Sequence, residues 1–132
     1  MQIETQHRVY MEHTDMQGVV NNAQYMNWMG WARQAFWQRV NYSEHEALQD
    51  GLSWRLVRVD CRYRHNVGLN ARIQQTTHVS VEGVRVVFQH RFRANDRVLV
   101  DATTEMCVID HQHRPVRLPD PVRDGVSQQP TS

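Results

Sequence analysis

The sequence contains no lysine, only two cysteines, and no apolar run of the length needed to span a membrane. Its basic side chains, histidine aside, are arginines, which the acidic residues almost balance to a formal net charge of +1. A dedicated nucleic-acid-binding protein normally has a strong basic excess, so this balance argues against that class. Arginine favours fixed contacts with phosphate or carboxylate, but genome composition explains the bias equally well, and we assign it no function.

The two cysteines, Cys61 and Cys107, are widely spaced and fall in predicted strands. Reduced thiols are therefore expected, and they are typical of cytoplasmic proteins. The first ten residues alternate polar and apolar side chains and do not resemble a signal peptide. With 132 residues the chain is long enough for one domain with a core of its own. We expect a cytoplasmic, single-domain protein that does not bind membranes.

The clearest pattern in the sequence lies between Asp15 and Val40. A short turn carries the carboxylate of Asp15, and Gly18 permits the chain to reverse there. Asn21 or Asn22 then offers a side chain that can cap the first turn of a helix. Beyond it, apolar side chains recur at the spacing of a helix with one wide buried face: Tyr25, Trp28, Met29, Ala32, Ala35, Phe36 and Val40. A carboxylate directly before an open helix N-terminus is a candidate catalytic arrangement.

The rest of the chain indicates a sheet. Residues 2–11 alternate weakly as one strand. A short helix follows the long one, with Ser43 as its cap, Glu46 as the capping-box partner and Gly51 as its end. From Trp54 the period is two, and an antiparallel meander of four long strands is expected at about 54–64, 73–81, 84–93 and 98–110.

These elements predict an α+β domain. A curled antiparallel sheet of about five strands would wrap around one long central helix, because this arrangement buries every apolar face. One helix cannot cover such a sheet completely, so a second copy is expected to cover the remainder and an edge strand. We place this domain at residues 1–120 and expect 121–132, a polar, proline-containing tail, to be irregular.

The order of these elements and several motifs resemble the hot-dog fold acyl-CoA thioesterases of the 4-hydroxybenzoyl-CoA thioesterase type. The resemblance covers residues 5–120 and is carried by Thr14-Asp15, Gln17-Gly18-Val19-Val20, Ala23, Tyr25, Trp28, Ala32-Arg33 and Arg117-Leu118-Pro119. It implies hydrolysis of an acyl-CoA or acyl carrier protein thioester by a homodimer, with a homotetramer as a larger form. It implies no metal and no separate cofactor, since coenzyme A is part of the substrate.

In such enzymes the aspartate of this turn is the catalytic carboxylate, which corresponds to Asp15. A backbone N–H at the start of the central helix polarises the thioester carbonyl, and that position, seven residues on, is Asn22. The carboxylate either attacks the carbonyl carbon or activates a water, and the sequence leaves both routes open. We further predict substrate contacts from Gly18, Val19, Tyr25, Trp28 and Met29, with Arg85 and Arg91 as candidates for the coenzyme A phosphates.

Two positions depart from the family pattern: Asn22 stands where many relatives have histidine, and Gly30 where they have an acidic residue. Two alternatives therefore stay open, a hydratase or dehydratase on the same fold and a non-catalytic protein that binds acyl thioesters. His13, two residues before the turn carboxylate, is a candidate for tuning the pKa of that carboxylate or for a second acid/base group. His111 and His113 have the spacing of two metal ligands on a strand, but no third ligand is evident, so no metal site is predicted.

Overall fold

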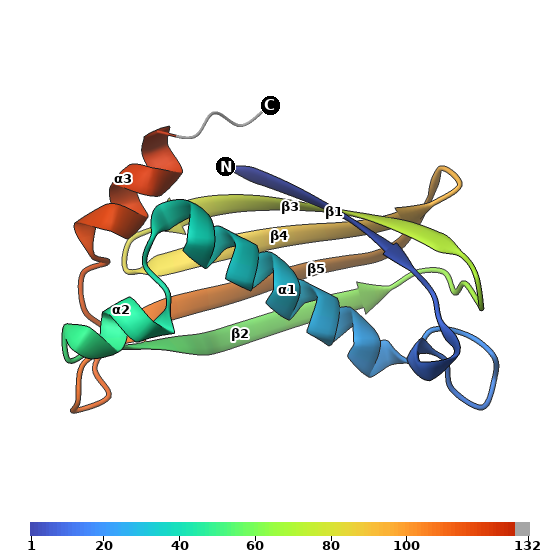
Figure 1. The fold of residues 1–132 in the computed structure, drawn as a ribbon, viewed down its shortest axis with the longest axis horizontal. Coiled ribbons are helices and arrows are strands. Elements are labelled where there is room, and N and C mark those ends of the chain that lie inside the picture. Colours follow the sequence, from blue (N-terminus) through green and yellow to red (C-terminus); the bar gives the residue numbers. More distant parts are fainter. Residues whose placement is uncertain (129–132) are drawn as a thin grey trace.

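The computed structural model of the protein describes residues 1–128 and contains one sheet with a long helix lying across one of its faces (Figure 1). No helix in this range is both long and apolar enough to cross a membrane. In chain order the elements are β1 (Gln2–Arg8), the 3-10 helix η1 (Met11–His13), α1 (Asn22–Val40), α2 (Glu44–Gln49), β2 (Ser53–Tyr63), β3 (Arg72–Glu82), β4 (Arg85–Ala94), β5 (Arg97–Ile109) and α3 (Asp120–Gln128).

The strands form one antiparallel sheet in the order β1-β3-β4-β5-β2. The four long strands begin and end within one residue of the predicted ranges. The predicted meander holds for β3, β4 and β5, but it is wrong for β2, which pairs with β5 and not with β3. The place beside β3 is taken by β1, because residues 64–71 carry the chain across the sheet end after β2. β2 and β1 are therefore the two edges.

α1 forms where the apolar spacing predicts it. Asn21 caps its N-terminus, since Asn21 Oδ1 accepts a hydrogen bond from Ala23 N at 2.8 Å, and Asn41 ends it in the left-handed conformation. The predicted face is buried except at Ala35, which is half-buried. This face packs into two apolar clusters, a first cluster around Phe36 and a second cluster around Trp28. The short helix α2 is also confirmed, with the predicted capping box at its start.

A belt of buried polar side chains lies between the two clusters. Gln75 Oε1 is 2.7 Å from His7 Nε2, and the His90 ring is 2.8 Å from Thr77 Oγ1 and 3.1 Å from Thr104 Oγ1. All five side chains are nearly or fully buried. Burial, and after it the charge of Arg33, lowers the pKa of His90 to about 3, so its imidazole is neutral. These mutual contacts satisfy polar groups that would be costly to bury alone.

The expectation of an irregular tail from residue 121 is wrong through Gln128, because this segment forms α3. Pro121 lies in the first turn, where its missing N–H has no intrahelical acceptor in any case. Val122 is fully buried in the first cluster, and Gly125 lies against Val40 of α1. The polar composition did not indicate this helix, because so few apolar side chains dock it. Residues 129–132 lie outside the described part of the chain.

Gly125→Ala is expected to lower the free energy of unfolding by about 1 kcal/mol, because overpacking outweighs the better helix propensity of alanine. A Cβ at position 125 would lie 2.6 Å from Val40 Cγ1. Gly30→Ala is the matched control, since a Cβ there meets only the end of Arg33 at 3.4 Å, and it should raise stability. Urea unfolding measures both. Equal stabilisation by the two substitutions would contradict the packing of α3 on α1.

Candidate active site

The residues between η1 and α1 fold back on themselves and present Asp15. An antiparallel bridge joins Thr14 to Val20, and Asn21 N donates a hydrogen bond to His13 O at 2.8 Å. The two ends of the segment are thereby held together just before the first turn of α1. The carboxylate of Asp15 and the helix N-terminus consequently belong to one compact unit, as the sequence predicts.

Hydrogen bonds within the turn orient the Asp15 carboxylate. Its Oδ1 accepts the N–H of Gln17 at 2.8 Å, while Gly18 N donates to Asp15 O and Asp15 N donates to Val19 O, both at 3.0 Å. Gly18 has φ +80°, which confirms the predicted use of glycine in the tight turn. The Asp15 side chain is exposed, and its Oδ2 receives no hydrogen bond from residues 1–128. One carboxylate oxygen is thus free to act.

The loop between β2 and β3 supports this turn. Val20 N donates to Val67 O at 2.9 Å, and Val19 forms a bridge with Gly68. A Cβ at position 68 would lie 2.8 Å from Gly18 O, so the approach of the two loops requires glycine there. Gly68 was missed in the sequence, because its surroundings indicate only a turn. A larger residue at this position would push the Asp15 turn away from its support.

The start of α1 offers an unpaired backbone donor at Asn22. Asn21 is the cap, and its side-chain and backbone oxygens accept the N–H groups of Ala23 and Gln24. Within the described residues, no acceptor is bonded to the N–H of Asn22, which is exposed. The positive end of the helix dipole lies here, and a free N–H at this point favours a negatively charged oxygen. The side chain of Asn22 is not required for this effect.

Tyr63 on β2 is a second site residue that the sequence did not reveal. Its hydroxyl donates to Asn22 O at 3.2 Å, and its ring lies 6.0 Å from that of Tyr25, centroid to centroid. The side chain is 44% exposed, so it borders the helix N-terminus from the β2 side. The period-two pattern that begins at Trp54 predicted only that Tyr63 lies on a strand. Its closeness to Asn22 depends on how the sheet curls.

Three helix residues predicted to contact substrate lie beneath this site, in the second cluster. Tyr25, Trp28 and Met29 are only 1–2% exposed, and Trp28 stacks on His7 with ring centroids 4.5 Å apart. Burial, followed by the effect of Cys61, raises the pKa of Tyr25 to about 12. Its hydroxyl has no hydrogen-bond partner within residues 1–128. In the single chain these side chains support the site from below, and their contact with substrate stays a prediction.

His13 closes η1, since its Nδ1 accepts Tyr10 N at 3.0 Å, and its ring lies 5.4 Å from that of Trp28. No hydrogen bond joins it to Asp15 in the described structure, so the predicted tuning has no direct contact to act through. His111 and His113 lie in the turn after β5 and not on a strand as predicted. Across residues 1–128, no group of three or more His, Cys, Asp or Glu side chains is arranged to hold a metal ion.

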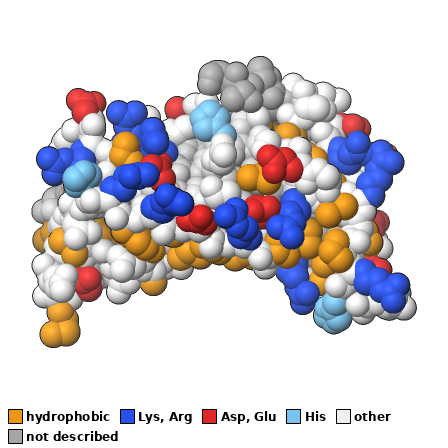
Figure 2. All heavy atoms as spheres, turned by 180° about the vertical axis from the view of Figure 1, so that it is seen from behind, with side chains coloured by type: hydrophobic (Ala, Val, Ile, Leu, Met, Phe, Trp, Pro, Cys, Tyr) orange, Lys and Arg blue, Asp and Glu red, His pale blue; other side chains and the backbone are white. Residues whose placement is uncertain are grey.

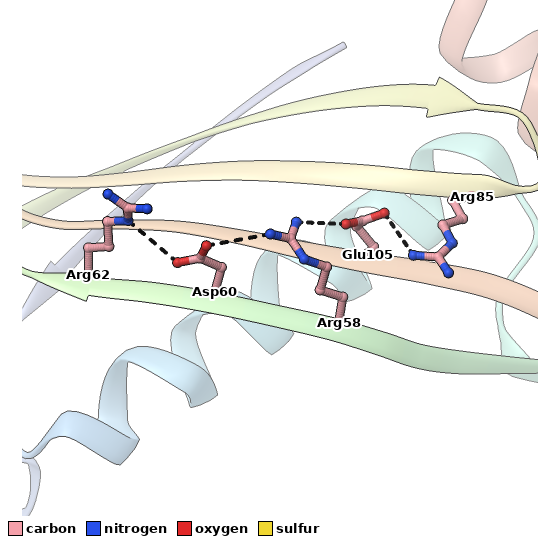
Figure 3. Close-up of polar contacts among 5 residues, drawn as sticks. All are labelled: Arg58, Asp60, Arg62, Arg85 and Glu105. Carbon is pink, nitrogen blue, oxygen red and sulfur yellow. Dashed lines mark hydrogen bonds and ion pairs between the residues drawn. The ribbon is translucent and has the colours of Figure 1, made fainter.

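Arg85 and Arg91 lie on the sheet face opposite α1, away from the Asp15 turn. Arg85 pairs with Glu105 at 3.1 Å, within the chain of ion pairs that Figure 3 shows running through Arg58 and Asp60 to Arg62. Arg91 pairs with Asp101 at 2.8 Å, and Arg64 with the same carboxylate at 2.9 Å. Arg58 and Arg85 hold the pKa of Glu105 below its ordinary range. Arg91 and Arg64 do the same for the pKa of Asp101. The structure does not bring the predicted phosphate contacts together with the site.

This combination of curled sheet, central helix and acidic turn has counterparts among known proteins. A sequence model described as the thioesterase-like superfamily matches residues 9–126. The chain belongs to this superfamily. It is 29% identical to a curated relative, "Acyl-CoA thioesterase YbgC" of Haemophilus influenzae, over 88% of each chain.

Solved structures confirm the hot-dog fold that the sequence predicts. A 1,4-dihydroxy-2-naphthoyl-CoA thioesterase from Synechocystis superposes with a TM-score of 0.88 at 16% identity, over 97% of both chains. SAV2348 from Staphylococcus aureus, solved in complex with CoA, superposes with a TM-score of 0.86 at 14% identity. That match covers 100% of this chain and 88% of the other. At these identities the likeness shows the fold alone.

Proposed function

We propose that this chain hydrolyses an acyl-CoA thioester to a free acid and the thiol of coenzyme A. The observation that carries the proposal is the unpaired N–H of Asn22 at the positive end of a 19-residue helix, next to a turn that presents the free Oδ2 of Asp15. Membership of the superfamily supports it, as do the name of the Haemophilus relative and the CoA complex of the Staphylococcus protein. An acyl carrier protein thioester presents the same carbonyl and is included.

In the proposed mechanism the carbonyl oxygen of the thioester accepts a hydrogen bond from the N–H of Asn22. The helix dipole stabilises the negative charge that develops on this oxygen. By one route Asp15 Oδ2 attacks the carbonyl carbon, the thiolate leaves, and water hydrolyses the resulting anhydride. By the other, Oδ2 takes a proton from a water that attacks the same carbon. Both routes release the acid and the thiol.

A hydratase or dehydratase is less well supported by the same geometry. Such an enzyme exchanges protons with the carbon chain next to the carbonyl, usually through a histidine that works with a carboxylate. The side-chain amide of Asn22 does not titrate, and within the described residues no hydrogen bond joins His13 to Asp15 as a histidine–carboxylate pair. A non-catalytic binder would keep the site without turnover.

We also propose a homodimer along β2, from which a tetramer of two dimers can be built. β2 is an edge strand, and its side chains Leu56, Val57, Val59 and Tyr63 are 38–44% exposed. Figure 2 shows hydrophobic side chains gathered along the lower margin of the molecule, the side on which β2 lies in Figure 1. A long edge with apolar side chains is normally covered, and a second copy covers it symmetrically.

We place the protein in the cytoplasm. Cys61 is half-buried and Cys107 is buried, and both are free thiols. Free thiols persist in that reducing compartment.

Asp15→Asn should lower the kcat for thiol release from acyl-CoA by roughly a hundredfold or more, because the amide neither attacks nor accepts a proton. Asparagine keeps an oxygen for Gln17 N, so the turn should survive. Asp110→Asn is the matched control, since Asp110 Oδ1 accepts Gln112 N at 2.8 Å in a comparable turn. Equal release by wild type and Asp15→Asn would exclude Asp15 as catalyst. Binding without release by wild type would indicate the binder, and hydration of enoyl-CoA without release the hydratase.

Asn22→Pro should reduce kcat by roughly a hundredfold, whereas Asn22→Ala should retain most of it. Proline removes the backbone N–H yet is favoured at the first position of a helix. The preceding residue, Asn21, has φ −62° and ψ 135°, which a following proline tolerates. Thiol release measures the effect, and circular dichroism confirms that α1 is kept. Similar losses in both variants would assign the role to the side chain.

Val59→Lys should convert the dimer to a monomer of 15.6 kDa in sedimentation equilibrium, because a charge on the edge opposes its pairing. Val84→Lys is the control, since Val84 is also 40% exposed but lies in the turn between β3 and β4. It should leave the mass at twice that of the chain. A monomeric wild type, or a dimer that survives Val59→Lys unchanged, would argue against an interface along β2.

A further inference from the structure

Arg33 differs from the other arginines of the chain. Of the arginines in the described residues, only Arg33 and Arg123 are half-buried while the others are exposed, and Arg33 lies on the central helix. No hydrogen bond or ion pair joins its guanidinium to any residue of the described range. Burial lowers its pKa, and no counter-charge offsets this. A half-buried cation without a partner is unfavourable, so an anion that reached it would be bound well.

Gly30 leaves open space beside this guanidinium. A Cβ at position 30 would meet only Arg33 Nη2, at 3.4 Å, so the arginine side chain folds back toward the glycine. A hollow of about 630 Å³ lies here, and its lining includes Met26, Gly30, Arg33 and Trp37. Glu12 also lines this Gly30 hollow but forms no ion pair with Arg33 within the described residues. The space accommodates the end of an acyl chain with a polar group.

The Gly30 hollow lies in line with the helix end that would polarise the thioester. One side of α1 carries Asn22, Met26, Gly30, Arg33 and Trp37, at successive spacings of four, four, three and four residues. Met26 is half-buried and packs against the second cluster. An acyl group whose carbonyl is held at the N–H of Asn22 would therefore run past an apolar side chain and end at a cation.

The helix also sets the length of that acyl group. The Arg33 guanidinium lies beside Gly30, which is eight residues beyond Asn22 on the helix. At a rise of ~1.5 Å per residue, the guanidinium is therefore about 12 Å from the thioester carbonyl. A saturated chain with C–C bonds of ~1.5 Å advances about 1.3 Å per bond. Roughly nine bonds span the distance, which corresponds to a chain of about ten carbons.

We propose that Arg33 recognises a carboxylate at the far end of the acyl group, so that the preferred substrate is the coenzyme A monothioester of a dicarboxylic acid. This inference rests on the proposed thioesterase function. The guanidinium fork binds a carboxylate through two hydrogen bonds, whereas a methyl-ended chain leaves the cation unpaired and its hollow half-filled. Arg33 determines specificity and does not touch the reacting atoms. In the proposed dimer, the second copy would shield the chain from water.

The test compares the monothioester of decanedioic acid with decanoyl-CoA, which has the same chain length and no carboxylate. Wild-type protein should hydrolyse the first with a kcat/KM roughly tenfold or more above the second. The monothioester of hexanedioic acid is too short to reach Arg33 and should show no advantage over hexanoyl-CoA. A preference independent of chain length would overturn the assignment to Arg33.

Four variants locate the preference. Arg33→Met keeps the stem without the charge and should bring the decanedioyl-to-decanoyl ratio close to one, while Arg33→Lys should retain part of it. Gly30→Glu supplies a carboxylate to Arg33 within the helix and should also abolish the preference. Gly30→Ala adds only a Cβ without charge, which leaves most of the hollow open, and should preserve most of the ratio. Circular dichroism confirms that each variant is folded.

The inference and the proposed function fail in different ways. A wild type that releases thiol from both ten-carbon substrates at equal kcat/KM, or an Arg33→Met variant that keeps the wild-type ratio, would overturn the inference and leave the thioesterase proposal intact. Pairing of Arg33 with an acidic side chain of a second copy would produce the first of these results. Should no thioester be hydrolysed, calorimetric dissociation constants of the same two thioesters decide the inference, which requires tighter binding of decanedioyl-CoA.

Discussion

The fold and the site both depend on the burial of one helix face in the curl of the sheet. Trp28, Met29 and Phe36 are essentially fully buried there, and each contributes on the order of 2 kcal/mol to stability through removal from water. Because a helix is rigid, the packing of these side chains also fixes where its first N–H groups point. The same packing therefore sets the positions of the free donor at Asn22 and of the cation at Arg33, which lie at different points along one helix.

The polar belt makes this packing specific. Its members lie on β1, β3, β4 and β5. On β3, β4 and β5 residues of the two apolar clusters lie on either side of the belt, and on β1 a residue of the first cluster precedes it. A shift of one strand by a residue would turn His7 or Gln75 outward and leave its partner buried without a hydrogen bond. The belt therefore holds the strands in register beneath the helix, which two apolar clusters alone would do less strictly.

Local patterns predicted the elements well, and three-dimensional neighbours poorly. The bounds of α1, the capping box at Ser43 and the turn glycine Gly18 depend on residues close in sequence, and the structure confirms them. The pairing of β2 with β5, the contact of Tyr63 with Asn22 and the need for glycine at position 68 depend on how distant segments meet. Contacts between distant segments leave no periodic pattern in the sequence. α3 escaped prediction for a related reason, since its stability comes from docking and not from its own composition.

In the proposed mechanism the N-terminus of α1 holds the thioester carbonyl beside Asp15. A crystal structure with an acyl-CoA analogue in which a methylene group replaces the thioester sulfur tests it most directly. The carbonyl oxygen should lie about 2.9 Å from Asn22 N, with Asp15 Oδ2 facing the carbonyl carbon or a water next to it. An analogue bound with its carbonyl out of hydrogen-bond range of Asn22 N would contradict the account.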